Sequence, residues 1–213
     1  MDKQSKKIFI RSFDGAGVIF IAAIVAAFGG VMAAWEARKF ESEVKAKNEE
    51  IVRLNNYILS SITGGDSFCY LALANINNVS NRALLTAISK GRYPLYDVHF
   101  RIVDLEELYK IKDNMTFENL KKTERTFNVG NIHPNVARML GTIELGAKNE
   151  KEYNVFISAR NGVFTQLIRL KHINEEWKTA TKVLKREGDN NIVLLEKIDE
   201  KFSSNENGEV DWK

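Results

Sequence analysis

The sequence predicts an all-β globular domain, an antiparallel sandwich of eight or nine strands, preceded by one transmembrane helix and a helical stalk. Three observations predict this arrangement. Residues 15–35 carry no charge, residues 36–63 repeat apolar side chains with the period of a helix, and from residue 66 onward the period changes to about two, as in strands. The 213 residues leave room for one modest domain beside these segments.

The charge balance and the cysteine count narrow the function classes. The chain has 31 Lys and Arg residues against 28 Asp and Glu residues, a formal net charge of +3. These charges are spread evenly, which argues against a nucleic-acid-binding surface. The single cysteine, Cys69, excludes an internal disulfide and a metal site built from several cysteines.

Residues 1–14 form a basic tail, and residues 15–35 form the predicted transmembrane helix. A helix of this length rises roughly 31 Å, which matches the hydrocarbon thickness of a bilayer. The membrane anchor consists of the large apolar side chains together with a tryptophan at the lipid–water interface. These residues are Val18, Ile19, Phe20, Ile21, Ile24, Val25, Phe28, Val31 and Trp35.

Two other interpretations of residues 15–35 compete with a membrane anchor. A buried helix of a soluble core is disfavoured because such helices rarely stay apolar on every face. A cleaved signal peptide would use the short side chains at residues 31–33 as its cleavage site. The apolar stretch is longer than the 7 to about 15 residues of a typical signal peptide, so we favour the uncleaved anchor.

The positive charges do not decide the orientation, because four Lys or Arg residues precede the segment and four follow within fifteen residues. A long C-terminal domain crosses a membrane largely regardless of its charge, whereas a short basic tail is retained. We therefore expect the N-terminus in the cytoplasm and the large domain outside it. The opposite orientation is the alternative.

Small residues repeat every fourth position within the membrane segment, at Ala22, Ala26, Gly30 and Ala34. Such a spacing allows two helices to approach closely in lipid. We treat it as a candidate contact only, since Ala and Gly are common in membrane helices.

The stalk, residues 36–63, carries a heptad pattern in which six of eight seam positions from residue 37 to residue 61 are apolar. The larger seam residues are Phe40, Val44, Ile51, Leu54 and Ile58, and Lys47 interrupts them. A dimeric coiled coil is one interpretation, and an amphipathic helix folded onto its own domain is the other. Gly64 and Gly65 are expected to end the helix.

Nine runs rich in Val, Ile, Phe, Tyr and Thr predict the strands of the β-sandwich domain, residues 66–198. They cover residues 67–76, 83–89, 94–103, 125–132, 138–145, 152–160, 163–173, 177–183 and 191–198. Asn161 and Gly162 predict a two-residue type I′ hairpin, because both tolerate positive φ. Asn174 to Glu176 predict a second hairpin, and the polar tail, residues 199–213, is expected to be disordered.

Residues 104–124 interrupt the strands with a charged insertion, which predicts one or two short helices and a loop where function could lie. The runs on either side, PLYDVHFRIVDL and VGNIHPNVARMLGTIEL, form two strand pairs around a Pro-containing turn. In this they resemble immunoglobulin-like sandwich modules. The resemblance covers about 55 residues, implies a sandwich fold and implies no activity.

Few residues point to chemistry. Gly65-Asp66-Ser67 is similar to the first block of the GDSL-type hydrolases, which implies Ser67 as a nucleophile, but the D-x-x-H that supplies the base is absent. The three histidines, His99, His133 and His172, have no partner at metal-ligand spacing. Asp97, His99 and Arg101 share one face of a strand, as a polar contact patch or as an ordinary solvated face. No phosphate, dinucleotide or zinc-protease motif occurs, and we expect no cofactor.

We therefore expect a single-pass membrane protein that presents a non-catalytic binding or scaffolding domain outside the cytoplasm. The expected partners are the lipid bilayer, a second copy through the stalk and an unidentified protein, with no nucleic acid. One alternative is a membrane-tethered sensor that faces the cytosol, and another is a hydrolase that depends on Ser67.

Overall fold

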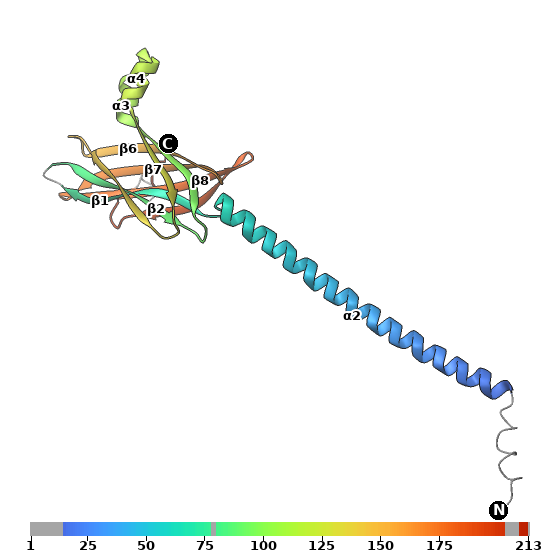
Figure 1. Ribbon diagram of the computed structural model, residues 1–213. Helices are drawn as coiled ribbons and strands as arrows, with labels where there is room; N and C mark the ends of the chain where they lie inside the picture. The colour runs from blue at the N-terminus through green and yellow to red at the C-terminus, as the bar shows by residue number, and fades with distance from the viewer. Residues whose placement is uncertain (1–14, 78–79, 203–208, 213) are drawn as a thin grey trace, which may run out of the picture. The chain divides into compact units, whose positions relative to one another are not determined.

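The computed structural model describes residues 15–77, 80–202 and 209–212. The chain divides into two compact units, Met1–Asn56 and Tyr57–Lys213, each with its own structure. The first unit is helical throughout its described part. The second contains all the strands (Figure 1).

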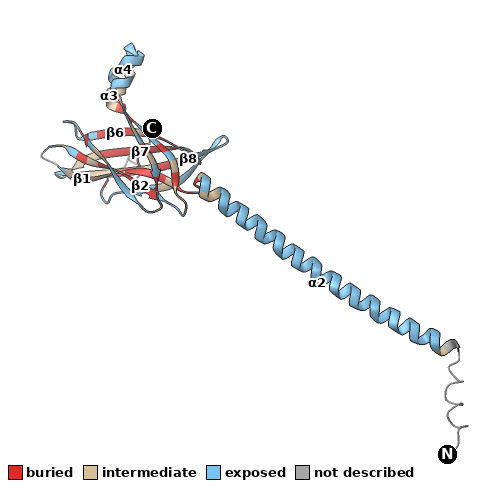
Figure 2. Ribbon diagram, viewed as in Figure 1, coloured by how far each residue is buried: buried red, intermediate tan, exposed pale blue. Residues whose placement is uncertain are grey.

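Helix α2 runs unbroken over 49 residues, Gly15–Thr63. All its side chains from residue 18 to residue 59 are exposed, including the nine predicted anchor residues and the five predicted seam residues (Figure 2). Its most apolar 18-residue window has a mean hydropathy of 2.4. By length and composition the helix could cross a membrane, as the sequence predicts.

The end of α2 is fixed by its last turn and by two glycines, as predicted. The Gly64 N–H donates to the Ser60 carbonyl at 2.9 Å, and the Thr63 hydroxyl donates to the Leu59 carbonyl at 2.7 Å. Gly64 and Gly65 have φ of 104° and 52°. At Gly65 a Cβ would also collide with the ring of Tyr93, so a side chain is excluded there on two grounds.

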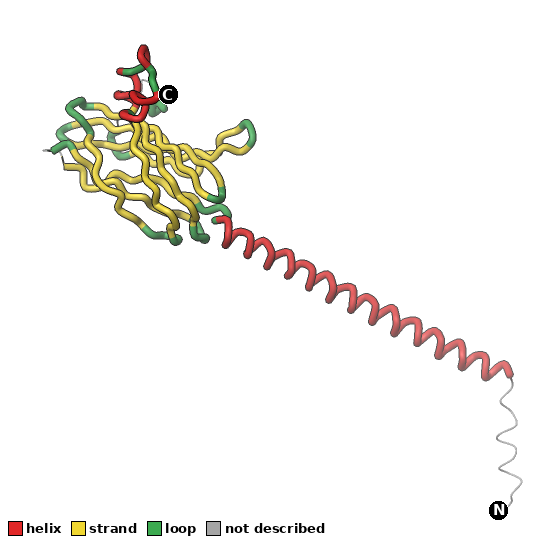
Figure 3. Tube along the Cα trace, turned by 45° about the horizontal axis from the view of Figure 1, so that its top comes forward, coloured by secondary structure: helices red, strands yellow, loops and turns green. Residues whose placement is uncertain are grey.

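The described residues of the second unit form nine strands, one for each predicted run. They are β1 (Phe68–Asn77), β2 (Arg82–Lys90), β3 (Leu95–Asp104), β4 (Glu124–Ile132), β5 (Ala137–Glu144), β6 (Glu150–Ala159), β7 (Gly162–Ile173), β8 (Glu176–Glu187) and β9 (Asn190–Ile198). All pairings are antiparallel. The strands form a three-stranded sheet in the order β1-β2-β5 and a six-stranded sheet in the order β4-β3-β6-β7-β8-β9 (Figure 3).

The two sheets pack face to face over one hydrophobic core. Alternation places one side of each strand inward: in β3, Val98, Phe100 and Ile102 are at most 2% exposed, while His99 and Arg101 face solvent. The thiol of Cys69 is fully buried, and this burial raises its pKa to about 12. It therefore behaves as a small apolar core residue.

Both predicted hairpins are present, but the turn type predicted for the first one is wrong. Ala159 pairs with Gly162, so the loop consists of Arg160 and Asn161, neither of which has positive φ, and the type I′ prediction is wrong there. The β7–β8 turn has φ of 49° at Asn174 and 65° at Glu175. The turn with two positive φ values, as type I′ requires, is therefore this one.

The charged insertion between β3 and β4 forms two short helices, α3 (Leu105–Lys110) and α4 (Phe117–Lys122), as predicted. The 3-10 turn η1 (Lys112–Asn114) connects them. The Asp104 side chain accepts from the Glu107 N–H and caps α3, and the Thr116 hydroxyl caps α4 in the same way. In Figure 1 the insertion projects from the sandwich.

The C-terminal tail was expected to be disordered, and this does not hold for residues 199–202 and 209–212. Phe202 and Val210 are at most 9% exposed and pack with Ala180 of β8, joined by Trp212. The side chain of Arg169 donates to the Trp212 carbonyl at 3.2 Å. The average polar composition of residues 199–213 predicted disorder, and the three apolar residues Phe202, Val210 and Trp212 are too widely spaced to form a pattern that predicts packing.

Candidate functional site

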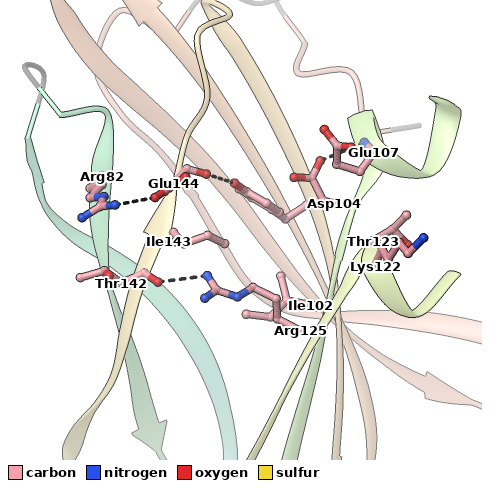
Figure 4. Close-up of a pocket in the computed structure, with 11 residues that line it drawn as sticks. Arg82, Ile102, Asp104, Glu107, Lys122, Thr123, Arg125, Thr142, Ile143 and Glu144 are labelled. Carbon is pink, nitrogen blue, oxygen red and sulfur yellow. Dashed lines mark hydrogen bonds and ion pairs between the residues drawn. The ribbon is translucent and has the colours of Figure 1, made fainter. Parts of the chain in front are cut away.

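A cleft of about 420 Å³ opens beside the base of the β3–β4 insertion (Figure 4). Its walls come from two edge strands, β5 of the smaller sheet and β4 of the larger one, and from α3 and α4. Three of its lining residues, Ile102, Ile143 and Tyr153, belong to the buried core. The lining residues are Arg82, Ile102, Asp104, Glu107, Lys122, Thr123, Arg125, Thr142, Ile143, Glu144 and Tyr153.

Two arginines join the edge strands that flank the cleft. Arg125 of β4 donates from Nη1 to the Thr142 carbonyl of β5 at 3.1 Å, and Arg138 of β5 donates to the Val129 carbonyl of β4 at 2.6 Å. These two bonds link the edge of the smaller sheet to the edge of the larger sheet beside the cleft.

The smaller-sheet wall of the cleft carries an ion pair. Arg82 Nη2 lies 2.6 Å from Glu144 Oε1, and both side chains are more than half exposed. The hydroxyl of Tyr153 donates to the Glu144 carbonyl at 3.0 Å. Burial is the main cause that raises the pKa of Tyr153, and the negative charge of Asp104 adds to it. The hydroxyl therefore stays protonated and remains a donor.

A buried lysine fixes the opposite wall. Lys151 is 5% exposed, and its ammonium group lies 2.8 Å from Asp104 Oδ2 and 3.0 Å from Glu106 Oε2. Burial opposes its charge, but the hydrogen bonds to Asp104 and Glu106 outweigh burial and raise the pKa of Lys151. Hydrogen bonds from Lys151 and Lys148 in turn lower the pKa of Glu106 to about 2. Helix α3 is therefore anchored to β6 by charges that persist at neutral pH.

The cleft is lined by charges of both signs. Its lining includes three basic residues, Arg82, Lys122 and Arg125, and three acidic residues, Asp104, Glu107 and Glu144. The Thr123 hydroxyl already donates to the Leu120 carbonyl at 2.8 Å. Such a surface can bind a chain that carries both donors and acceptors, such as a polypeptide.

Ser67, the nucleophile of the hydrolase alternative, lies away from this cleft. It is fully buried, and its hydroxyl accepts from the Tyr93 N–H at 2.9 Å. The Asn161 side chain donates to the Ser67 carbonyl at 2.6 Å. These bonds hold the β2–β3 loop and the β6–β7 turn together, which gives Ser67 a structural role.

The polar patch on β3 is present but does not act as one group. Asp97, which has φ of 56°, pairs with Arg160 at 2.9 Å. Arg101 stacks on the Phe156 ring at 4.5 Å and pairs with Glu124 at 3.3 Å. The patch borders a shallow depression of about 470 Å³ on the outer face of the larger sheet, lined by His99, Phe156 and Val163 among others.

The histidines lie on separate elements, as their spacing predicts. His99 is in β3, His133 lies in the β4–β5 loop, and His172 of β7 stacks against Trp177. Within residues 15–77, 80–202 and 209–212, no three His, Cys, Asp or Glu side chains converge to hold a metal ion.

The residues that build the cleft were not predictable one by one. The insertion was identified as a functional loop because of its charge, and it does contribute Glu107 and Lys122. Arg125 and Arg138, in contrast, sit in ordinary strand runs. In the sequence, Arg125 and Arg138 are only basic residues within predicted strands. Their role follows from the position of those strands at the sheet edges, which the sequence pattern does not show.

Comparison of the chain with protein-family models, with curated proteins and with solved structures finds no match.

Proposed function

We propose that this chain is a single-pass membrane protein whose β-sandwich is a non-catalytic binding domain, with the charged cleft as its contact surface for a polypeptide segment of another protein. The observation that carries the proposal is the cleft. It lies beside two edge strands that Arg125 and Arg138 link, and three cations and three carboxylates line it together with the buried residues Ile102, Ile143 and Tyr153. Helix α2 supports membrane anchorage, since its apolar residues have no partner within the described chain.

The position of the cleft suits this role. Residues 57–67 are attached to one end of the sandwich: the Ser61 carbonyl accepts from Tyr96, and the Ile62 carbonyl accepts from Arg160. Strand β3 begins at this end and runs to the other, where the insertion and the cleft lie. The end that bears the chain connection thus stays separate from the end that would receive a ligand.

The strand order supports an immunoglobulin-like fold for the domain. The constant-type order, numbered along the chain, is 1-2-5-4 in one sheet and 3-6-7 in the other. The order here is β1-β2-β5 and β4-β3-β6-β7, with β8 and β9 added at the edge. The fourth strand has moved from one sheet to the other, and the remaining neighbours are the same.

Photo-crosslinking in native membranes tests the cleft. A benzophenone amino acid placed at Lys122 or Thr142 should yield a discrete protein adduct, whereas the same group at exposed Asn191 of β9 should not. Adducts from Val163 alone would move the site to the outer face of the larger sheet, and equal yields at all positions would contradict a binding cleft.

We further propose that the domain faces away from the cytoplasm. The four cations of the short N-terminal tail favour keeping that tail in the cytoplasm, whereas a long C-terminal domain crosses the membrane largely regardless of its charges. Fusions to Lys213 test this orientation. Alkaline phosphatase should be active there and a fluorescent protein dark. The reverse pattern would favour the cytosol-facing sensor.

A further inference from the structure

We propose that two copies of α2 pair in parallel along one continuous seam that runs from the stalk into the bilayer. This inference rests on the membrane anchorage proposed above and names the partner of the helix: a second copy of this chain. It starts from the stalk seam, whose apolar side chains are unpartnered, with Phe40 69% exposed and Ile51 54% exposed.

The heptad register of the stalk extends into the membrane segment without a break. Helix α2 is continuous over Gly15–Thr63, so the alternating steps of three and four residues that include Phe40 can be counted backwards from residue 37. They fall on Ala33, Gly30, Ala26 and Ala23, and then on the larger Ile19. Four consecutive seam positions within the membrane segment are therefore Ala or Gly.

The face of α2 away from the seam also changes between the two segments: it carries large apolar residues in the membrane segment and mostly polar residues in the stalk. All eight positions on the far side from the seam between residues 18 and 35 are Val, Ile, Phe, Met or Trp. From residue 38 to residue 56, seven of the nine outer positions are polar or charged. The face away from the seam is thus apolar where the solvent is lipid and polar where the solvent is water.

Each half of the seam suits the solvent around it. In water, large apolar side chains drive helix pairing because pairing removes them from solvent. In lipid that driving force is absent, and small residues favour pairing because they let backbones approach. At Gly30 a Cβ would meet no atom within 4 Å, so the fold of a single copy does not require glycine there.

A second copy is the occupant that fits both halves at once. A partner helix must place its small residues in the bilayer and its large apolar residues in water at the same levels as α2 does, over roughly 60 Å of helix. A parallel second copy meets this condition by symmetry. A straight helix drifts about 20° per heptad, so the two halves stay on one seam only in a left-handed supercoil. Lys47 within the seam and Glu36 opposite Glu41 weaken the pairing.

Cysteine crosslinking of the full-length protein in membranes tests the register. The native Cys69 is fully buried and does not interfere. Single cysteines at Ala23, Ala33 and Ile51 should form disulfide dimers, whereas cysteines at Phe28 and Val52 on the outer face should not. Dimers at Ala22 and Ala34 in place of Ala23 and Ala33 would overturn the continuous seam, and so would uniform or absent crosslinking.

A second measurement separates pairing from anchorage. In lipid vesicles, Gly30→Leu should weaken dimerisation about tenfold, measured by energy transfer between labelled copies, and the matched outer-face variant Phe28→Leu should leave it unchanged. Equal effects of both variants would overturn the seam. Loss of the wild-type protein from the membrane fraction would instead contradict the anchorage itself.

Discussion

Helix α2 and the sandwich contain the same apolar residue types and treat them in opposite ways. Phe28 of α2 is 70% exposed, whereas Phe100 of β3 is 1% exposed. In water each exposed side chain of this size forgoes about 1.5 to 3 kcal/mol of burial. A nine-residue set of such side chains on one helix therefore indicates a different solvent or a partner, and the sandwich needs neither.

The comparison extends to the way each region treats backbone groups. Most backbone groups of α2 bond within the helix, whereas side chains supply partners to backbone groups on edge strands of the sandwich. Gln166 does this for β1: its Oε1 accepts from the Leu71 N–H and its Nε2 donates to the Leu71 carbonyl, both at 2.7 Å. Arg125 and Arg138 do it for β5 and β4.

The largest effect is expected at Gln166. Gln166→Leu keeps the side-chain volume but leaves both Leu71 backbone groups buried without partners, which should lower the free energy of unfolding by about 3 kcal/mol. Urea unfolding of the detergent-solubilised protein, followed by tryptophan fluorescence, measures it. The exposed variant Val163→Thr on the same strand should change stability by less than about 0.5 kcal/mol. Similar values for both variants would mean that the edge contact is unimportant.

A smaller effect is expected from acid. The folded pKa of Glu106 is lowered to about 2 from an ordinary value of 4.5, so its stabilisation is present above pH 4.5 and is lost as the pH falls towards 2. The carboxylate is partly solvated, so we expect about 1 kcal/mol. Unfolding measured across this range should show a shallower loss in Glu106→Gln. If the free energy of unfolding fell equally steeply with pH in both proteins, the contact of Glu106 with Lys151 would not be what anchors α3.

The smallest effect is expected at the β7–β8 turn, and it should be stabilising. Glu175 has φ of 65°, a conformation that costs a side chain about 1 kcal/mol relative to glycine. Glu175→Gly should raise the free energy of unfolding by about 0.5 kcal/mol, after the interactions of the glutamate are lost. Thermal unfolding of Glu175→Gly measures this change, with Asn174→Gly measured in parallel. A loss of stability in Glu175→Gly would show that the interactions of the Glu175 side chain outweigh the backbone strain.

Patterns within a segment predicted the elements, and contacts between segments could not be predicted. The nine strands follow from alternating residues, and the end of α2 follows from Gly64 and Gly65. The hairpin loop at Arg160 and Asn161 was displaced by one residue because pairing between Ala159 and Gly162 sets the register. The contact of Gln166 with Leu71 spans 95 residues, and no local pattern encodes it.

The candidate site divides in the same way. The insertion was identified from its charge, which is a local property. The cleft depends on which strands become edges, and β4 and β5 lie at the edges of two different sheets. Arg125 therefore acquires its role from the topology, which its neighbours in the sequence do not reveal.

Alkaline carbonate extraction of membranes that contain the full-length protein measures whether lipid is the solvent of residues 15–35, as proposed. We expect the chain to stay in the membrane pellet with its N-terminal segment intact. Release of the intact chain into the soluble fraction, or its recovery without residues 1–33, would contradict it.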